Sequence, residues 1–234
     1  MTADQIARAR RLAREFKARP AGATVTTEFI AKDEFPPPAA SASGFFVTED
    51  GFLITSERVV RQATRIQLLT RIGMIVATVV KVDATNDLAL LKAEGRFAAL
   101  PVAASRAAGV WDTVAAVGFA EPTSSRFAAR LTEGEIAALS GVADDPRYFR
   151  LSVQLPANTA GGALVDQRGN VVGVMSGSAA SAKASQALKS SVLLDFLATV
   201  PELAGRLGEA HTKVRKFTEL APSIEPASAQ VRVY

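Results

Sequence analysis

The sequence predicts a mainly β protein built from many short antiparallel strands. Between Gly44 and about Gly177, apolar segments rich in Val, Ile, Leu and Phe recur at close spacing, with turn residues between them. Two of these turns, TEDG over 48–51 and DQRGN over 166–170, are typical of β-hairpins. Because no helices alternate with these segments, an antiparallel barrel or sandwich is expected rather than a parallel sheet.

Size and composition indicate a globular protein without disulfide or thiolate chemistry. The chain has 234 residues, enough for one large or two small domains with a buried core. Hydrophobic residues make up 48% and charged residues 21%, a balance typical of globular domains. There is no cysteine and only one histidine, so a Cys-based metal site is excluded and a zinc site is not expected. The sequence therefore predicts no metal and no cofactor.

Charge and hydropathy narrow the classes of partner. No window of about 18 apolar residues is present, so no membrane span is expected. The N-terminus also lacks the apolar core of a signal peptide. The net charge is +4, and six basic residues fall within the first 19 positions. A basic surface favours anionic partners, but no recognition motif accompanies it, so nucleic-acid binding is not expected.

Four segments are expected along the chain: an N-terminal helix over 1–19, a linker over 20–43, a β domain over 44–207 and a tail over 208–234. In the first segment Thr2 and Gln5 have capping-box spacing, and apolar residues follow at helical spacing. This stretch, MTADQIARARRLAREF, resembles the last helix of Sel-like helical repeat arrays. Helical spacing also predicts a second helix over 190–206. The tail is expected to be irregular, with its last five residues adding an edge strand.

Three segments in order carry a family resemblance: SGFFVTEDGFLITSERVV (43–60), VDATNDLALLK (82–92) and NTAGGALVDQRGNVVGV (158–174). They resemble trypsin-like serine proteases of the HtrA/Deg type. That family has Thr-x-x-His-Val-Val, Asp-Leu-Ala-Leu-Leu and Gly-Asn-Ser-Gly-Gly-Pro-Leu-Val at these places. A fourth segment, ALKSSVLLDFL (187–197), resembles the strand and helix that close the domain. The resemblance implies a trypsin-like double antiparallel β-barrel, flanked here by an N-terminal and a C-terminal helix.

The resemblance also implies that this chain has lost the catalytic activity of the family. Arg58, Asp87 and Ala160 stand at the positions of the catalytic His, Asp and Ser, and Asn158 replaces the first Gly of the last motif. In the triad a serine hydroxyl attacks while an imidazole takes its proton. Ala160 has no nucleophilic atom, and Arg58 has no lone pair to accept a proton. The oxyanion-hole positions are Asn158 and Ala160. We therefore expect a pseudoprotease, that is, a catalytically inactive homologue.

If catalysis is lost, the substrate-binding groove that the family resemblance implies becomes the expected functional feature. Trypsin-like domains bind extended peptides by adding them to a sheet edge, and the resemblance implies that the strand over 170–177 forms that edge. The residues expected to line the groove are Val153, Leu155, Val174, Met175 and Ser176. The expected partner is an extended peptide, an unfolded protein or a partner protein, bound by a scaffolding or peptide-binding domain. The family resemblance favours the periplasm or cell envelope, and the oligomeric state is left open.

Arg58 itself has two interpretations. Its guanidinium is able to pair with Asp87, replacing the His–Asp hydrogen bond by a structural salt bridge. The same group is also suited to hold a carboxylate or another anion in the old cleft.

Other functions stay open at this point. The chain is a serine endopeptidase if Ala160 is an engineered substitution, or a hydrolase with a non-standard site if Thr159, Asp87 or His211 acts instead. It is a structural domain if the 31–43 loop or the tail blocks the groove. It is an anion-binding surface if a set of basic residues acts together: Arg8, Arg10, Arg11, Arg14, Lys213, Arg215 and Lys216.

Overall fold

A computed structural model describes residues 37–104, 108–119, 127–155, 157–177 and 185–234. The expected N-terminal helix over 1–19 and most of the expected linker over 20–43 lie outside these residues. The described strands are β1 (Ala40–Phe46), β2 (Phe52–Thr55), β3 (Ile66–Thr70), β4 (Gly73–Asp83), β5 (Leu88–Ala93), β6 (Thr113–Phe119), β7 (Ala129–Ala138), β8 (Tyr148–Leu151), β9 (Ala163–Asp166), β10 (Val171–Met175), β11 (Gln186–Lys189) and β12 (Ser228–Val233). The described α-helices are α2 (Glu57–Val60), α3 (Ser190–Ala198) and α4 (Phe217–Ile224).

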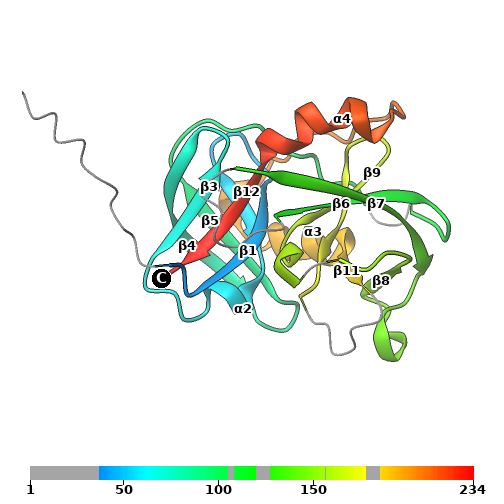
Figure 1. The fold of residues 1–234 in the computed structure, drawn as a ribbon, viewed down its shortest axis with the longest axis horizontal. Coiled ribbons are helices and arrows are strands. Elements are labelled where there is room, and N and C mark those ends of the chain that lie inside the picture. The colour runs from blue at the N-terminus through cyan, green and yellow to red at the C-terminus, as the bar shows by residue number, and fades with distance from the viewer. Residues whose placement is uncertain (1–36, 105–107, 120–126, 156, 178–184) are drawn as a thin grey trace, which may run out of the picture. The chain divides into compact units, whose positions relative to one another are not determined.

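The strands form two closed barrels of six strands each, which confirms the predicted double antiparallel barrel. The first closes in the order β1-β12-β3-β4-β5-β2, and the second in the order β10-β11-β8-β7-β6-β9. Figure 1 shows the two barrels side by side, and β1 of the first contacts β6 of the second. No helix in the described part of the chain is long and apolar enough to cross a membrane.

Strands β2, β3 and β5 of the first barrel are buried on both faces, which explains why β2 and β5 are almost continuously apolar. Successive side chains of a strand point to opposite sides. In β2, Leu53 belongs to the core inside the first barrel, whereas the next residue, Ile54, packs into the layer shared by both barrels. Leu90 and Leu91 of β5 divide in the same way. The shared layer also takes up the apolar faces of α3 and α4, so one core joins both barrels.

The tail forms the expected strand at its end and is irregular up to residue 216, but the strand completes the first barrel rather than lying at an edge, and a helix, α4, precedes it. Strand β12 pairs with β1 on one side and β3 on the other, as Figure 1 shows in red. Its polar residues hid this role in the sequence, but Gln230 Oε1 accepts hydrogen bonds from Arg232 Nε and Nη2 at 3.1 and 2.8 Å. The two side chains thus satisfy each other within a buried strand.

The helices near the C-terminus also differ from expectation. Helix α3 ends at Ala198 rather than 206, and a short 3-10 turn begins at Pro201, which has no N–H to continue a helix. Helix α4 contains Pro222, which obscured its helical pattern in the sequence. Its buried side chains, Phe217, Leu220 and Ile224, nevertheless keep one face against the shared core.

Replacing Val231 of β12 by alanine tests whether the first barrel depends on this strand. Val231 is 0% exposed, so Val231→Ala is expected to lower the free energy of unfolding by about 2 kcal/mol through lost burial and the cavity left behind. Val76→Ala is the matched control, because Val76 is 54% exposed on β4 of the same barrel and should change stability by less than about 0.5 kcal/mol. Urea unfolding measures both. Equal effects would show that β12 is not an integral strand.

Candidate functional site

Arg58 and Asp87, 29 residues apart, meet as an ion pair beside the expected active site. Arg58 lies on α2, directly after β2, and Asp87 ends the turn before β5. Arg58 Nε and Nη2 donate to Asp87 Oδ2 at 3.0 and 2.9 Å. Asp87 Oδ1 accepts hydrogen bonds from the Arg58 backbone N–H at 2.9 Å and from the Ser56 hydroxyl at 2.8 Å. The carboxylate therefore has four donors, and the guanidinium uses one edge for it.

The turn that carries Asp87 is held by hydrogen bonds from both barrels. Asp87 has a φ of 55°, a left-handed conformation that aspartate tolerates better than most residues. Asp83 Oδ1 accepts the backbone N–H of Asn86 at 3.1 Å, and Arg147 Nη1 donates to Asn86 Oδ1 at 2.9 Å. Hydrogen bonds from the Arg147 side chain and backbone hold the pKa of Asp145 below its usual value. Arg147 thus links the turn to the strand β8 that follows it.

Ala160 lies on a turn that is pressed against the backbone of both barrels. Its carbonyl accepts the Ser43 backbone N–H at 2.9 Å. Gly161 follows with a φ of +77°, and a Cβ there would lie 2.5 Å from the Ser56 nitrogen and 2.6 Å from the Ser43 oxygen. A Cβ on Gly162 would lie 2.0 Å from the Val117 oxygen of β6. Only glycine fits at both positions, so the two-glycine motif has a packing reason in this chain.

Ser43 joins this turn to both barrels, a role that the sequence did not reveal. Its side chain is 1% exposed, and its hydroxyl donates to the Asn158 carbonyl at 2.9 Å. The same oxygen accepts the Phe119 N–H at 3.1 Å, at the end of β6. Asn158 Nδ2 in turn donates to the Phe119 carbonyl. Asn158, at the first oxyanion-hole position, is therefore fixed by its side chain as well as by its backbone.

Gly177 separates Ala160 from Arg58. A methyl group at Gly177 would lie 2.8 Å from Ala160 Cβ and 3.9 Å from Arg58 Nη1. Ala160 is only 5% exposed, whereas the Arg58 side chain is 44% exposed. The structure thus brings the three expected positions together, with the guanidinium of Arg58 beside the methyl group of Ala160 and Asp87 behind it.

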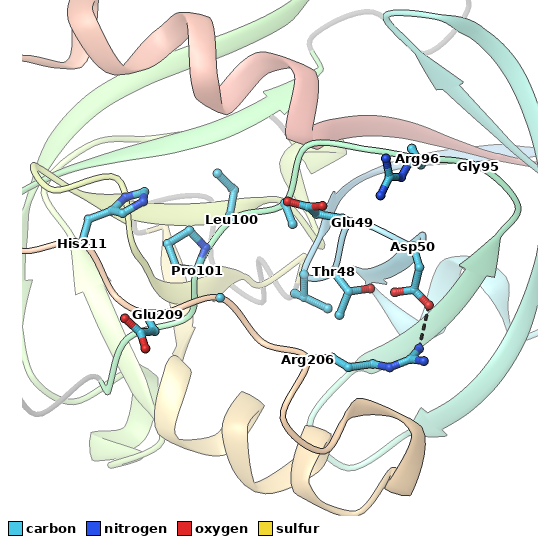
Figure 2. Close-up of a pocket in the computed structure, with 13 residues that line it drawn as sticks. Thr48, Glu49, Asp50, Gly95, Arg96, Leu100, Pro101, Arg206, Glu209 and His211 are labelled. Atoms are coloured by element: carbon cyan, nitrogen blue, oxygen red, sulfur yellow. Dashed lines mark hydrogen bonds and ion pairs between the residues drawn. The ribbon is translucent and has the colours of Figure 1, made fainter.

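The residues considered as substitutes for the triad are held elsewhere. The Thr159 methyl group packs on Gly118, where a Cβ would lie 2.6 Å from it. His211 lines a different cavity of about 570 Å³, together with the ion pair between Asp50 and Arg206 (Figure 2). Glu57, next to Arg58 in the chain, is buried and binds Arg61 instead, its Oε2 lying 2.7 Å from Arg61 Nη2.

The expected peptide groove is wrong in part. Val174 and Met175 are 2% and 3% exposed, and β10 pairs with β9 and β11 on its two sides, so neither residue lies on a free sheet edge. Closure of the second barrel is the reason. The Ser176 N–H also donates to the Gln186 carbonyl at 3.0 Å. Val153 and Leu155 are half-buried, and their place in a groove stays a prediction.

Among the described residues, no three side chains of His, Asp or Glu come together to hold a metal ion. The charged groups at this site are instead paired as Arg58 with Asp87, Arg61 with Glu57 and Arg147 with Asp145.

Replacing Gly161 by alanine tests whether the turn depends on its backbone contacts. Gly161→Ala is expected to lower the free energy of unfolding by more than about 3 kcal/mol, because the left-handed φ costs about 1 kcal/mol and the clash with two strands adds the rest. Gly205→Ala is the matched control: its φ is +70°, but nothing lies within 4 Å of the added Cβ, so about 1 kcal/mol is expected. Equal losses in denaturant unfolding would remove the packing argument.

Comparison with known proteins agrees with this architecture. The model of the trypsin-like peptidase domain matches residues 42–174. An uncharacterized protein, y4bJ of Sinorhizobium fredii, is 33% identical over 144 residues, covering 58% of this chain and 22% of that protein. A probable periplasmic serine endoprotease, DegP-like, of Rhizobium meliloti is 32% identical over 145 residues, covering 58% of this chain and 28% of the relative. The matched part is thus less than a third of either relative.

A solved structure shares the fold. The HtrA-type protease AlgW, solved with a decapeptide, has a TM-score of 0.60 and 23% sequence identity, covering 69% of this chain and 51% of that chain. The resemblance inferred from the three motifs is thereby confirmed at the level of the domain. The chain belongs to the trypsin-like peptidase domain family, with relatives among the HtrA-type proteases.

Proposed function

We propose that this chain is an inactive trypsin-like protease homologue that binds extended peptides or unfolded protein without cutting them. The observation that carries the proposal is the ion pair between Arg58 and Asp87 beside Ala160. A serine protease needs a hydroxyl to attack and a neutral nitrogen to take its proton. Ala160 offers only a methyl group, and a guanidinium on a carboxylate keeps its charge and accepts no proton.

The contacts of the residues that differ from the family motif also bear on whether the change at Ala160 is natural. A Ser→Ala substitution made to trap a substrate would explain Ala160 alone. Arg58 instead satisfies the carboxylate of Asp87 with two hydrogen bonds from its side chain, and Asn158 is bonded through its own side chain. Because Arg58 and Asn158 each have well-formed side-chain contacts, we favour a natural loss of catalysis over a single engineered substitution. This domain would then act as a binding or scaffolding module, in the periplasm if it follows its DegP-like relative.

A second candidate, serine endopeptidase activity, is favoured by the names of two relatives. The DegP-like protein of Rhizobium meliloti and DegS of Haemophilus influenzae are both named serine endoproteases. In this candidate Ala160 is not the native residue, or another group supplies the nucleophile. The two candidates differ in one observable, which is the appearance of new peptide termini.

Incubation with labelled, unfolded casein separates the two candidates. If the proposal holds, the chain is expected to raise the fluorescence anisotropy of casein by binding it, and to produce no new termini in mass spectrometry of the same sample. New termini that vanish in Asp87→Ala would contradict the proposal and favour the endopeptidase. If the chain neither binds nor cleaves casein, the proposal is also contradicted, and a purely structural domain becomes the better interpretation.

Reversing the three departures tests the cause of inactivity. The triple variant Arg58→His, Ala160→Ser, Asn158→Gly is expected to cut casein at a rate on the order of 10³-fold or more above the unmodified chain, since a base and a nucleophile return together. Arg58→His alone and Ala160→Ser alone are the controls and should stay inactive. Unfolding curves must show that the triple variant is folded. A folded triple variant without activity would show that the site lacks more than these three groups.

A further inference from the structure

One edge of the Arg58 guanidinium is occupied and the other is open. Nε and Nη2 bind a single oxygen of Asp87, whose carboxylate also accepts the Ser56 hydroxyl and the Arg58 N–H. Within the described residues, Nη1 has no hydrogen-bond partner. A guanidinium presents its donors in a planar fork, so an arginine that holds one carboxylate still presents N–H groups to a second anion.

The open edge faces the place where a substrate would have been cut. The Cβ position of Gly177 lies between Nη1 and the methyl group of Ala160, so a glycine lets the two groups approach each other. A side chain there would meet Ala160 at 2.8 Å and Nη1 at 3.9 Å. The Arg58 side chain is 44% exposed, so an incoming group reaches it without displacing Asp87.

The other arginines of the site have their guanidinium groups on neighbouring carboxylates. Arg61 binds Glu57 through both Nε and Nη2, and Arg147 binds Asp145 and Asn86 with three of its nitrogens. Arg61 also leaves its Nη1 without a partner among the described residues, but of the three arginines only Arg58 lies within 4 Å of the Gly177 Cβ position, next to Ala160. A carboxylate is the anion that matches its geometry and that every peptide carries at its C-terminus.

We propose that Arg58 is a carboxylate-binding residue, which holds the C-terminal carboxylate of a bound peptide, or an Asp or Glu side chain, beside Ala160. This inference rests on the proposed function, because it names the class of peptide that the inactive site selects. The arginine at the position of the catalytic histidine would then both remove the catalytic base and create the carboxylate site. An active protease would release such a peptide as its product, whereas this chain retains it.

Three pools of fluorescein-labelled decapeptides of mixed sequence without Asp or Glu provide the test. The first has a free C-terminal carboxylate, the second a C-terminal carboxamide, and the third a carboxamide with one added aspartate. The free acid is expected to bind about tenfold more tightly than the amide, the difference that one charge-assisted hydrogen-bonded contact gives. The third pool separates the two sources: binding equal to that of the acid identifies a side-chain carboxylate as sufficient, and binding equal to that of the amide assigns the site to the C-terminus.

Variants locate the effect. Arg58→Gln is expected to abolish the preference for the carboxylate, and Arg58→Lys to reduce it strongly, because an ammonium group on Asp87 has no second edge. Arg71→Gln is the charge-matched control, since Arg71 lies exposed in the turn between β3 and β4 and should leave the preference intact. Circular dichroism and urea unfolding confirm that each variant is folded.

The outcomes distinguish this inference from the proposed function. Equal binding of the acid and amide pools by the unmodified chain overturns the carboxylate site and leaves peptide binding in place. A preference that persists in both Arg58→Gln and Arg58→Lys overturns the role of Arg58, because the carboxylate is then held elsewhere. Failure of all three pools to bind overturns both the inference and the proposed function.

Discussion

The architecture depends on close backbone contact between one turn and both barrels. Gly161 and Gly162 bring this turn so near to β1, to the end of β2 and to β6 that a single added carbon at either position would overlap a backbone atom. The carbonyl of Ala160 and the hydroxyl of Ser43 then close hydrogen bonds across the same junction. Because these contacts involve backbone groups, they do not require a catalytic side chain at position 160. The junction thus stays intact around an alanine at position 160.

The ion pair between Arg58 and Asp87 is a second constraint at this site. The Arg58 side chain supplies two of the four donors to the Asp87 carboxylate, and its backbone N–H supplies a third. A partly exposed ion pair of this kind adds little to stability. Its consequence is instead positional, since it keeps the guanidinium beside Gly177 and Ala160 and prevents it from swinging into solvent.

Much of the fold was predictable because the central strands bury both faces. Segments such as FLIT and LALL are apolar at every position, since one side of the strand fills a barrel and the other fills the layer between barrels. The positions of Arg58, Asp87 and Ala160 were predictable from three local motifs. The groove was not, because the burial of Val174 and Met175 depends on both partners of β10. Nor were the contacts of Ser43, Ser56 and Gly177, which join residues that are remote in the sequence and belong to no periodic pattern.

The position of β12 has a consequence for the order in which the molecule can be built. All six strands of the second barrel lie within Thr113–Lys189, so that barrel has its full set of strands before residue 228 is made. The first barrel begins at Ala40 but waits for Ser228–Val233, and contacts such as that between Thr64 and Tyr234 join residues 170 positions apart. During synthesis, which proceeds from the N-terminus, the barrel encoded first is therefore the one completed last. In the meantime β1 and β3 each present an unpaired edge, the kind of surface on which chaperones act and aggregation starts.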